Sequence, residues 1–489
     1  MTSASSTFDV PLPPAFTAQA ERLLGPGATV FLDALAQPPL SGLRVNTLKL
    51  TPEELQRLSP WRLEAVPWCE AGFINLPQSP QRIWGEAEGG WGGKHPYHAA
   101  GLDYLQEPSA MAVGEILNPQ PGERVLDLSA APGGKATHLA SLMKSQGWLL
   151  ANEIHPRRAW ELAENLERWG AQHVCVLNET PERLGSYFGA YFDRVLLDAP
   201  CSGEGMFRKS DAARREWSPE HVAGCAIRQD EILHQAARLV RPGGWLAYAT
   251  CTFNPQENEA VIARVLEAGE KGELPHFELV EPSRRPGFDP GHPDWLPASI
   301  TRLELTSMVR IWPHTAPGEG HTITLLRRSV DEPSERDLLP YRSTPLSKEA
   351  ARAWREFCQS SLVPSACERL AGETLAQVGS YLYRLPPGMP DLGGLRAIHP
   401  GWWLGVLRKE RLEPAHALAL GLRGVDAQRK LDFEPDDPRL TAYLRGESLR
   451  GIPGEDGWLL VTVNTYPLGW GKRAQGVVKN FYPRGLRRF

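Results

Sequence analysis

A regular alternation of short apolar strands and helices, from about residue 101 to residue 329, constrains the fold more than any other feature. The first apolar run, Arg124–Leu128, precedes a glycine-rich turn and a helix predicted over Lys135–Lys144. A strand over Trp148–Ile154 and a helix over Pro156–Trp169 follow in the same order. Such alternation predicts a doubly wound, mostly parallel sheet with ligand sites at the carboxyl ends of its strands.

Later elements continue this pattern. Strands are predicted over His173–Leu177, Asp193–Leu197 and Trp245–Thr250, helices over Ile227–Val240 and Gln256–Leu266, and a closing hairpin over Met308–Trp312 and His321–Leu326. The sequence therefore predicts one α/β unit over residues 101–329.

Residues 1–100 predict a separate, small α/β domain. Arg44–Lys49 alternates like a strand, and Thr51 is followed by a proline and two acids, as at the start of a helix. The composition of Gly85–His98 is that of a loop.

The chain after the α/β unit divides into two further parts. Residues 330–400 begin with a polar linker and continue as a small mixed α/β segment. Residues 401–489 contain an apolar run, a helix around Ala415–Gly421 and a strand over Trp458–Val463. We expect this last part to be a compact β-rich module.

Composition excludes several classes of protein. With 489 residues, 42% of them hydrophobic and 23% charged, the chain has enough apolar content to build cores and is not disordered. It has no apolar run near the ~18 residues of a membrane span, and its first residues do not read as a secretory signal. The seven cysteines have no C-x-x-C spacing, which predicts reduced thiols in the cytoplasm and no metal.

The charge is unevenly distributed. The net charge of −5 weakly disfavours a nucleic-acid partner, but Gly457–Phe489 contains no acidic residue. Its basic residues are Lys472, Arg473, Lys479, Arg484, Arg487 and Arg488. Interleaved aromatic residues such as Tyr466, Trp470 and Phe481 are candidates for stacking on bases. The alternative is a solvated, charged terminus with core aromatics.

The turn within Leu126–Lys135 is a candidate cofactor site. Its small residues allow the backbone to approach a ligand, and the following helix offers unpaired N–H groups. Glu153 ends the next predicted strand about 20 residues later, where an acid in nucleotide-binding folds accepts hydrogen bonds from ribose. The turn matches neither G-x-G-x-x-G nor a Walker loop, so a glycine-rich connection and a surface glutamate remain the alternative.

Two thiols follow neighbouring predicted strands. Asp198 and Cys201 end one strand, and Cys251 ends the next. A single free cysteine is usually a small buried hydrophobe. Two thiols beside an acid at the carboxyl edge of this kind of sheet indicate chemistry instead.

Taken together, these motifs resemble the Sun/nucleolar-protein family of RNA cytosine-5 methyltransferases. The matching segments are Arg44–Lys49, Leu126–Lys135, Asp198–Gly205, Thr250–Glu259 and Gly318–His321. Further motifs, from Val66 to Phe73 and in the tail, resemble the members that act on 16S ribosomal RNA. The resemblance implies a Rossmann-like, S-adenosylmethionine-dependent methyltransferase core, a small N-terminal RNA-binding α/β domain and a C-terminal β-rich PUA-like RNA-binding module.

The resemblance also implies the roles of individual residues. Cys251 corresponds to the nucleophile that adds to C6 of cytosine, Cys201 to the thiol that assists release, and Asp198 to the group that positions and protonates the base. The implied S-adenosylmethionine site consists of Ala130, Ala131, Pro132, Gly133, Gly134, Lys135, Ala136, Glu153, Asn178 and Asp198. The chain departs from the family pattern at Asn178, where aspartate is common, and at Ser129, where cysteine is common.

Several alternatives remain open at this point. A DNA cytosine methyltransferase would take its nucleophile from Pro200-Cys201, which Thr250-Cys251 and the N-terminal domain disfavour. A tRNA substrate, a non-catalytic RNA-binding assembly factor and a protein methyltransferase are the others, although neither of the last two has use for paired thiols. We expect a monomer that acts on ribosomal RNA, free or in the small subunit.

Overall fold

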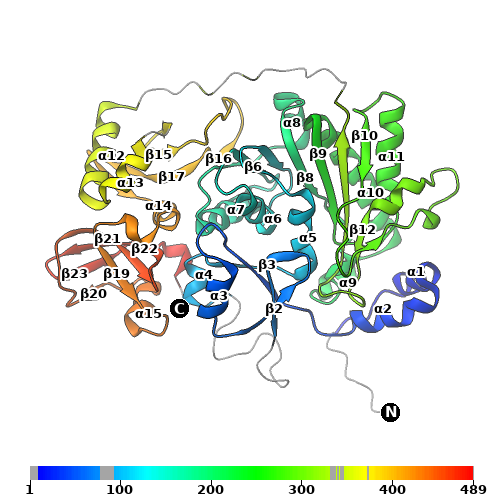
Figure 1. The fold of residues 1–489 in the computed structure, drawn as a ribbon, viewed down its shortest axis with the longest axis horizontal. Helices are drawn as coiled ribbons and strands as arrows, with labels where there is room; N and C mark the ends of the chain where they lie inside the picture. The colour runs from blue at the N-terminus through cyan, green and yellow to red at the C-terminus, as the bar shows by residue number, and fades with distance from the viewer. Residues whose placement is uncertain are drawn as a thin grey trace, which may run out of the picture.

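The computed structural model describes residues 9–76, 93–330, 338, 341, 346–371 and 374–487 (Figure 1). Most of the predicted loop Gly85–His98 and the polar linker over residues 331–337 lie outside the described residues. The described end of that loop forms a short helix, α4 (Pro96–Ala99).

A central, mostly parallel sheet carries the α/β unit. Its parallel strands lie in the order β7-β6-β5-β8-β9. Their bounds are β5 Arg124–Asp127, β6 Trp148–Asn152, β7 Val174–Leu177, β8 Phe192–Asp198 and β9 Val240–Thr250. The chain leaves β5 for β6 on one side and returns to β8 on the other, so the strand order reverses at β5. The doubly wound, Rossmann-like fold is confirmed, and the glycine-rich turn lies at its switch point.

Antiparallel strands extend this sheet at both edges. Beyond β9 lie β13 (His321–Arg328), β12 (Val309–Ile311) and β11 (Asp289–Pro290), and β10 (Phe277–Val280) also pairs with β13. The predicted hairpin is therefore present as β12 and β13. Beyond β7 lies β16 (Ala397–His399), a strand that comes from far along the chain.

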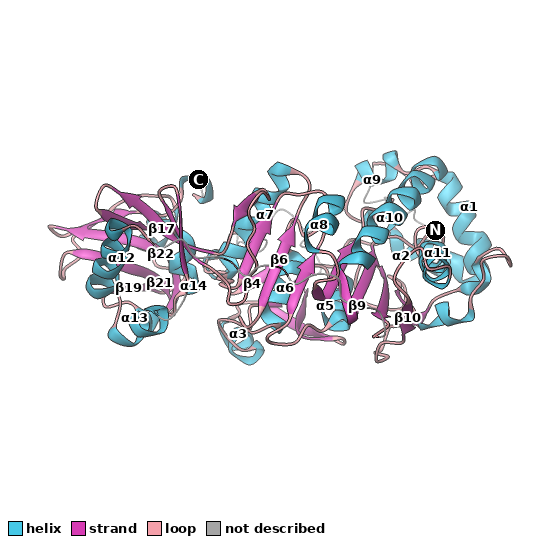
Figure 2. Cartoon of the chain, turned by 90° about the horizontal axis from the view of Figure 1, so that it is seen from above, coloured by secondary structure: helices cyan, strands magenta, loops and turns pink. Residues whose placement is uncertain are grey.

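Helices cover both faces of the sheet, as the two views in Figures 1 and 2 show. One face packs against α8 (Pro181–Phe188), α10 (Pro219–Leu239) and α11 (Glu259–Glu270), and the other against α5 (Pro108–Leu117), α6 (Gly134–Leu142) and α7 (Pro156–Trp169). The helix α7 has the predicted bounds. The helix α10 begins earlier than predicted, because Ser218 caps its N-terminus and a proline follows.

The N-terminal sheet has the order β2-β3-β1-β4. Its strands are β1 Gly42–Val45, β2 Arg62–Val66, β3 Cys69–Leu76 and β4 Asp103–Leu105. The strand predicted to reach Lys49 ends at Val45, because the side chain of Asn46 accepts a hydrogen bond from Leu48 N (3.1 Å) and closes a turn. Since β4 pairs with β1, this sheet also crosses the boundary expected after residue 100. The helix start predicted at Thr51 is present: a capping box opens α3 (Pro52–Leu58).

Two N-terminal helices lie apart from that sheet. The helices α1 (Pro14–Leu24) and α2 (Ala28–Leu35) pack against the catalytic unit, at the lower right of Figure 1. Phe16 and Phe31 join Phe253 and Trp312 in one aromatic cluster. The N-terminal region thus covers the segment that follows Cys251.

The C-terminal part contains two sheets, in line with the β-rich module that the sequence predicts. The first has the order β14-β15-β17-β18, with bounds Leu375–Val378, Tyr381–Arg384, Trp402–Arg408 and Arg411–Pro414, and packs with α12 (Lys348–Ser361) and α13 (Pro364–Ala371). It crosses the boundary expected between residues 400 and 401, because β17 pairs with β15. The helix α14 (His416–Gly421) follows it.

The second C-terminal sheet has the order β19-β21-β22-β23-β20. Its bounds are β19 Lys430–Phe433, β20 Leu449–Arg450, β21 Gly457–Val463, β22 Tyr466–Ala474 and β23 Val477–Asn480, with α15 at Pro438–Leu444. Within the described ranges, the chain forms no helix both long and apolar enough to span a membrane.

Candidate active site

The residues singled out in the sequence gather at the carboxyl edge of the central sheet. Asp127 ends β5, Asp198 ends β8, and Cys251 follows β9. Asp198 lies beside Ala249 in the register of β8 and β9. The turn after β8 and the loop after β9 are therefore neighbours, as the strand order requires.

The two thiols meet across these loops. Cys201 Sγ and Cys251 Sγ lie 3.4 Å apart, and both side chains are partly exposed. The hydrogen bond to Cys251, together with burial and the charge of Glu257, raises the pKa of the Cys201 thiol well above its usual value. The two sulfurs are therefore close enough for one thiol to donate a hydrogen bond to the other.

Lys135 connects the glycine-rich turn to the thiol loops. Its Nζ donates a hydrogen bond of 2.6 Å to Oδ2 of Asp198. Burial alone lowers the pKa of Lys135, but the carboxylate of Asp198, with smaller contributions from Cys251 and Asp127, raises it above its usual value. A fixed positive charge therefore lies among the acids and the thiols, where it favours anionic groups.

Asp127 is a buried carboxylate that the sequence analysis does not single out. Burial, and then the charge of Asp198, raise the pKa of Asp127 to about 8. The backbone of Ser129 approaches the carboxylate, but neither oxygen has a hydrogen-bond partner of acceptable geometry. An unsatisfied buried acid is costly. At the start of the glycine-rich turn, these two oxygens indicate a place for a ligand with donor groups.

The glycine-rich turn presents the N-terminus of α6. Gly133 has a φ of +116°, a conformation that favours glycine, and a Cβ there would lie 3.3 Å from Leu162 and from Asn165. Asn165 donates to the carbonyl of Pro132 (2.8 Å), and Arg158 of α7 donates to that of Ala131 (2.8 Å). The helix α7 thus fixes the turn from outside.

Glu153 and Asn178 lie together at the ends of β6 and β7. Glu153 is 2% exposed, which corrects the alternative of a surface glutamate. Its Oε1 accepts from His155 N (2.9 Å), and Arg158 lies 3.4 Å from its Oε2. The side-chain amide of Asn178 donates to the carbonyls of Glu153 (2.7 Å) and Ile154 (2.8 Å). The edge of the sheet therefore holds both residues in fixed positions beside the glycine-rich turn.

Glu257 fixes the spacing of the two thiols. Its Oε1 accepts from Ser202 N (2.8 Å) and Gln229 Nε2 (3.0 Å), and its Oε2 accepts from the hydroxyls of Ser202 and Thr252. Burial raises the pKa of Glu257, and these donors act in the opposite direction. Because Ser202 follows Cys201 and Thr252 follows Cys251, one buried carboxylate connects both thiol loops.

Glu204 makes a second connection between the same loops. It accepts from Trp217 Nε1 (3.1 Å) and from Phe253 N (2.8 Å), while Gly205 N donates to the carbonyl of Cys251 (2.8 Å). Burial, and then the charge of Glu257, raise the pKa of Glu204 to about 7. In the sequence, Glu204 and Glu257 lie within the motifs Asp198–Gly205 and Thr250–Glu259, but no role was predicted for them. A carboxylate close in sequence to each cysteine was the signal that could have identified them.

The N-terminal domain also contacts the glycine-rich turn. Arg44 of β1 is fully buried and donates to the Gly134 carbonyl (3.0 Å) and to Thr137 Oγ1 (2.6 Å). Asn46 and Lys49, from the same motif, donate to backbone carbonyls near the end of α7, at Trp169 (2.7 Å) and Arg168 (3.1 Å). In this structure the motif Arg44–Lys49 therefore joins the N-terminal domain to the catalytic unit.

The basic tail contains both exposed and structural residues. Lys479 and Arg484 are exposed, whereas Arg473 is buried and donates to the carbonyl of Glu455 (3.2 Å). Trp470 is 1% exposed, and its Nε1 donates to the carbonyl of Ala415 (2.9 Å). Trp470 is thus a core residue, which removes it from the predicted stacking surface.

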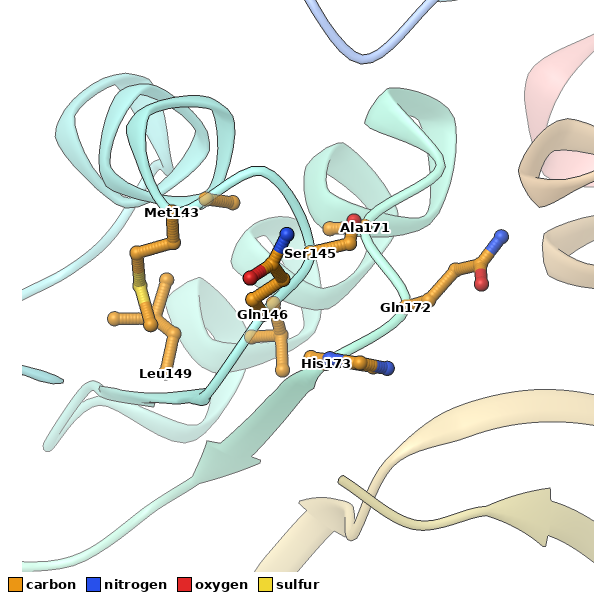
Figure 3. A pocket seen from close by; sticks show the side chains of 9 residues that line it. Met143, Ser145, Gln146, Leu149, Ala171, Gln172 and His173 are labelled. Atoms are coloured by element: carbon orange, nitrogen blue, oxygen red, sulfur yellow. The ribbon is translucent and has the colours of Figure 1, made fainter. Parts of the chain in front are cut away.

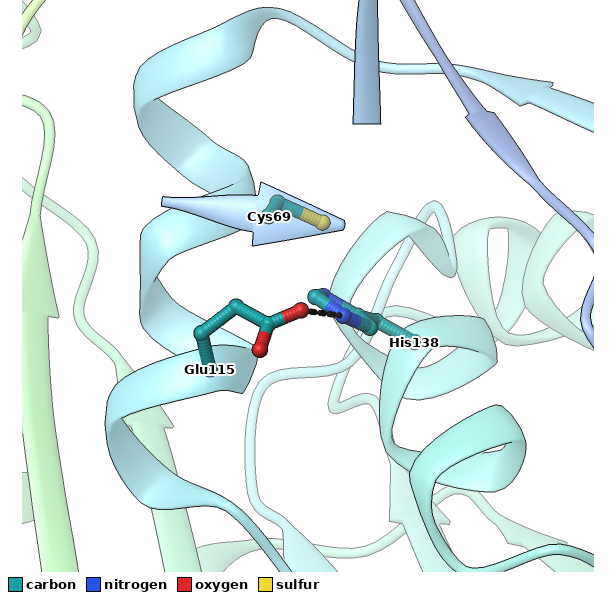
Figure 4. A group of neighbouring side chains, drawn as sticks. All are labelled: Cys69, Glu115 and His138. Atoms are coloured by element: carbon teal, nitrogen blue, oxygen red, sulfur yellow. Dashed lines mark hydrogen bonds and ion pairs between the residues drawn. The ribbon is translucent and has the colours of Figure 1, made fainter. Parts of the chain in front are cut away.

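Figure 4 shows a group of potential metal ligands outside this site, on β3, α5 and α6. The ligand atoms of Cys69, Glu115 and His138 lie within 4.8 Å of one another, with Glu115 Oε1 and His138 Nε2 hydrogen bonded at 3.1 Å. The buried guanidinium of Arg44 interacts electrostatically with each of them. Because its positive charge opposes a cation, we interpret the group as a polar contact between the N-terminal domain and the catalytic unit.

Figure 3 shows a small hollow at the opposite end of β6 and β7. It has a volume of about 10 Å³ and is lined by residues that include Met143, Leu149 and His173. A site for a drug-sized ligand or cofactor needs roughly 300 Å³ or more. The hollow is therefore too small for a nucleoside cofactor.

Family models match most of the chain. Residues 114–327 match 16S rRNA methyltransferase RsmB/F, residues 12–108 the N-terminal domain of 16S rRNA methyltransferase RsmF, residues 356–422 the RsmF rRNA methyltransferase first C-terminal domain, and residues 430–488 the methyltransferase RsmF PUA domain. The first C-terminal match includes β17 and α14, in agreement with the sheet that crosses residue 400.

Curated relatives match over nearly their whole length. Ribosomal RNA small subunit methyltransferase F of Klebsiella pneumoniae is 32% identical over 94% of this chain and 92% of its own. The protein of the same name from Erwinia tasmaniensis is 31% identical over 99% of this chain and 98% of its own.

Solved structures match the catalytic fold. A methyltransferase homolog protein from Pyrococcus horikoshii is 30% identical, with a TM-score of 0.53, and the match covers 64% of this chain and 94% of that one. NSun6 from Pyrococcus horikoshii is 20% identical, with a TM-score of 0.55 over 65% of this chain and 99% of that one, which shows the fold alone.

Proposed function

The chain belongs to the 16S rRNA methyltransferase RsmB/F family, and on that premise we propose that it methylates C5 of a cytosine in small-subunit ribosomal RNA with S-adenosylmethionine. The observation that carries this proposal is the pair of thiols 3.4 Å apart beside a salt-bridged aspartate. C5 of cytosine reacts only after a nucleophile has added to C6, and a thiolate does this well.

We assign the cofactor to the carboxyl edge of β5, β6 and β7. The buried oxygens of Asp127 without partners and the close-packed turn at Gly133 support this assignment. The residues that would hold S-adenosylmethionine are Ala130, Ala131, Pro132, Gly133, Gly134, Lys135, Ala136, Glu153, Asn178 and Asp198, with Asp127 added. When bound, the cofactor supplies an electrophilic methyl group.

Cys251 is the nucleophile in this proposal. Its thiolate forms a bond to C6, and the electrons of the C5–C6 double bond move to make C5 nucleophilic. Asp198 holds N3 and the amino edge and passes to N3 a proton that Lys135 supplies through their hydrogen bond, and this proton returns to the pair when Cys251 leaves. The reverse assignment, with Cys201 as nucleophile, would match a DNA cytosine methyltransferase, and the motif at Thr250-Cys251 together with the matched N-terminal domain disfavours it.

Cys201 acts after methyl transfer. Its raised pKa comes first from the hydrogen bond to Cys251, and the charge of Cys251 also contributes. Cys201 Sγ lies 3.4 Å from Cys251 Sγ, so it is beside the adduct when a base is needed. After Cys201 has released its own proton to solvent, its thiolate takes the C5 proton, the double bond re-forms, and the bond between Cys251 and C6 breaks. The target base must be unstacked for C6 to be reached.

Isotope transfer tests the proposal directly. Incubation with methyl-labelled S-adenosylmethionine and small ribosomal subunits, or their free RNA, should place the label in 5-methylcytidine after nuclease digestion and mass spectrometry. The Cys251→Ala variant should give no labelled RNA. Label at another base or in protein contradicts the proposal, and no transfer by the folded parent to either substrate favours the assembly-factor alternative.

We further propose that the C-terminal module binds ribosomal RNA. We also propose that the enzyme is a monomer and acts in the cytoplasm. Among the described residues of the tail, Lys479 and Arg484 are exposed cations that can contact phosphate. Truncation at Gly457 is unsuitable as a test, because β21, β22 and β23 form the body of the sheet.

Charge removal tests this docking instead. The double variant Lys479→Ser, Arg484→Ser should bind RNA more weakly, and its RNA affinity should depend less on salt, while its cofactor affinity stays unchanged. The matched control removes two exposed cations elsewhere, Lys271 and Arg352. Equal affinity and salt slope in both variants would remove the tail from the docking surface.

A further inference from the structure

A segment from the C-terminal part of the chain, residues 394–399, extends the central sheet beyond β7, next to the proposed cofactor site. The strand β16 pairs antiparallel with β7, with Ala397 opposite Leu177 and His399 opposite Val176. Both figures that show the whole chain place the C-terminal part beside this edge of the catalytic sheet. Without β16, the main-chain groups of β7 on this side would form an open sheet edge.

Several contacts hold this segment in place along β7. The side chain of Cys175 donates to the carbonyl of Pro400 (2.9 Å), and His399 Nε2 lies 3.1 Å from Glu167 Oε1 on α7. Met389 and Leu392 are buried in the same core as Leu177 and Leu184. At the amino end of β7, Arg384 donates to His173 Nε2 (3.0 Å). Residues 384–400 are therefore packed against the catalytic unit along the whole length of β7.

At the carboxyl end of β7, the segment bonds directly to residues beside the proposed cofactor site. Asn178 N donates to the carbonyl of Arg396 (2.9 Å), and Arg396 N donates to Glu179 Oε1 (2.7 Å). Arg183 donates to the carbonyl of Gly394 and lies 3.3 Å from Glu179 Oε2. Glu179 is 1% exposed, so its charge depends on these donors from α8 and from the C-terminal segment.

The same residues determine where Glu153 and Asn178 lie. The side chain of Asn152 binds the backbone of Glu179: its Nδ2 donates to the Glu179 carbonyl (3.0 Å), and its Oδ1 accepts from Glu179 N (3.0 Å). The side chain of Asn178 holds the carbonyls of Glu153 and Ile154. A continuous series of hydrogen bonds therefore leads from Arg396, through Asn178 and Glu179, to the loop that carries Glu153.

We infer that the segment 394–399 is a positioning element of the cofactor site, which acts through Asn178 and Glu179 on the loop at Glu153. The C-terminal part is then required for cofactor affinity as well as for the proposed RNA docking. Any event that displaces the segment from β7 weakens cofactor binding to the same extent that cofactor binding stabilises the docked segment. This inference rests on the cofactor site assigned under the proposed function.

A pair of substitutions at one residue tests the inference in the full-length chain. Arg396→Pro removes the N–H that bonds Glu179 and keeps the carbonyl that accepts from Asn178. Arg396→Ala keeps both backbone groups and removes the side chain, a mostly exposed guanidinium 3.7 Å from Glu179 Oε2 whose ion pair contributes little. We expect Arg396→Pro to raise the Kd for S-adenosylmethionine about tenfold by calorimetry, with kcat at saturating cofactor within twofold of the parent. Arg396→Ala should change the Kd less than twofold.

Glu179→Ala removes the same hydrogen bond from the other side, and it replaces Arg396→Pro if that variant does not fold. In a double variant the two losses should add only in part, because both substitutions break the hydrogen bond between Arg396 N and Glu179. Unchanged cofactor affinity in the folded Arg396→Pro and Glu179→Ala variants would overturn the inference, as would an equal loss in Arg396→Ala. Failure of the parent itself to bind S-adenosylmethionine would instead reject the proposed function.

Discussion

The two halves of the carboxyl edge, on either side of β5, are built differently. On the β8–β9 side, the acids Glu204 and Glu257 each accept hydrogen bonds from a thiol loop and from a side chain outside it. On the β5–β7 side, Asp127 has two buried oxygens without partners, and Asn178 contacts a segment more than 200 residues away. We call these the thiol half and the cofactor half.

The difference corresponds to two physical requirements. Reacting groups have to be held at fixed spacing before substrate arrives, and a satisfied buried network does that. A binding site has to leave polar groups unsatisfied so that the ligand can satisfy them. The carboxylate network of the thiol half therefore lies within the catalytic unit, whereas the cofactor half is completed by its ligand and by β16.

The largest expected effect separates the roles of the two thiols. Cys251→Ala should abolish methyl transfer and form no covalent adduct with RNA. Cys201→Ala should still attack and transfer the methyl group but release product slowly, so that a protein–RNA species survives denaturing electrophoresis. Thermal melting controls for folding. An adduct seen with Cys251→Ala and absent with Cys201→Ala would reverse the assignment.

A second substitution removes the support of the thiol half. Glu257→Ala leaves the buried donors of Ser202, Gln229 and Thr252 without their acceptor, at about 1–3 kcal/mol for each unsatisfied group. We expect a loss of at least about 3 kcal/mol in the free energy of unfolding, measured in urea, and a fall in kcat larger than any change in KM.

The matched control at this position is Glu257→Gln, which keeps the volume and one acceptor oxygen. It should fold more stably than Glu257→Ala and retain more activity. Equal stability of parent and Glu257→Ala would show that the thiol half does not depend on this carboxylate.

A smaller effect is expected for Glu153 in the cofactor half. A hydrogen bond to a charged acceptor contributes about 1.5–3 kcal/mol, so Glu153→Ala should raise the Kd for S-adenosylmethionine roughly ten- to a hundredfold. Because Glu153 is buried and bonds His155 N, folding has to be checked by melting. Glu153→Gln should bind with intermediate affinity. An unchanged Kd in both variants would remove Glu153 from the site.

A further expected effect is a pH dependence of stability caused by Asp127. Its pKa is about 8 in the folded protein and near 3.8 in an unfolded chain, so the folded state binds the proton more tightly. Its contribution to stability is greatest below pH 4 and falls as the pH rises toward 8, by up to about 1.4 kcal/mol per pH unit. Asp127→Asn removes this dependence.

Urea denaturation at pH 5 and pH 8 measures that difference. The parent should lose more stability between the two values than Asp127→Asn does. Parallel losses in parent and variant would mean that Asp127 titrates normally, and the contrast between the two halves would then be weaker than described.

Local patterns were sufficient for much of the fold. The proline and acids after Thr51 predicted a capped helix, and the periodicity over Pro156–Trp169 gave the bounds of α7. The strand–helix alternation indicated a parallel sheet, and parallel strands put the segments after β5, β8 and β9 at one edge. For that reason Asp198, Cys201 and Cys251 could be named from sequence as neighbours.

Long-range contacts decided what local patterns could not. The boundaries expected at residues 100 and 400 fall inside sheets, because β4 pairs with β1 and β17 pairs with β15 across them. Trp470 and Arg473 lie in a basic, aromatic tail but are buried, since neighbouring elements cover them. Sequence composition gives no information about which face of a strand is covered.

The sequence by itself determined the order of the elements, the loops that carry the chemistry and the residue types available there, because these follow from periodicity and spacing along the chain. Only the tertiary structure decided which carboxylates are satisfied and which are not, that the sulfurs of Cys201 and Cys251 lie 3.4 Å apart, and that β16 closes the cofactor half. Burial, electrostatic coupling and edge pairing arise from groups that are distant in sequence, so they exist only once the chain has folded.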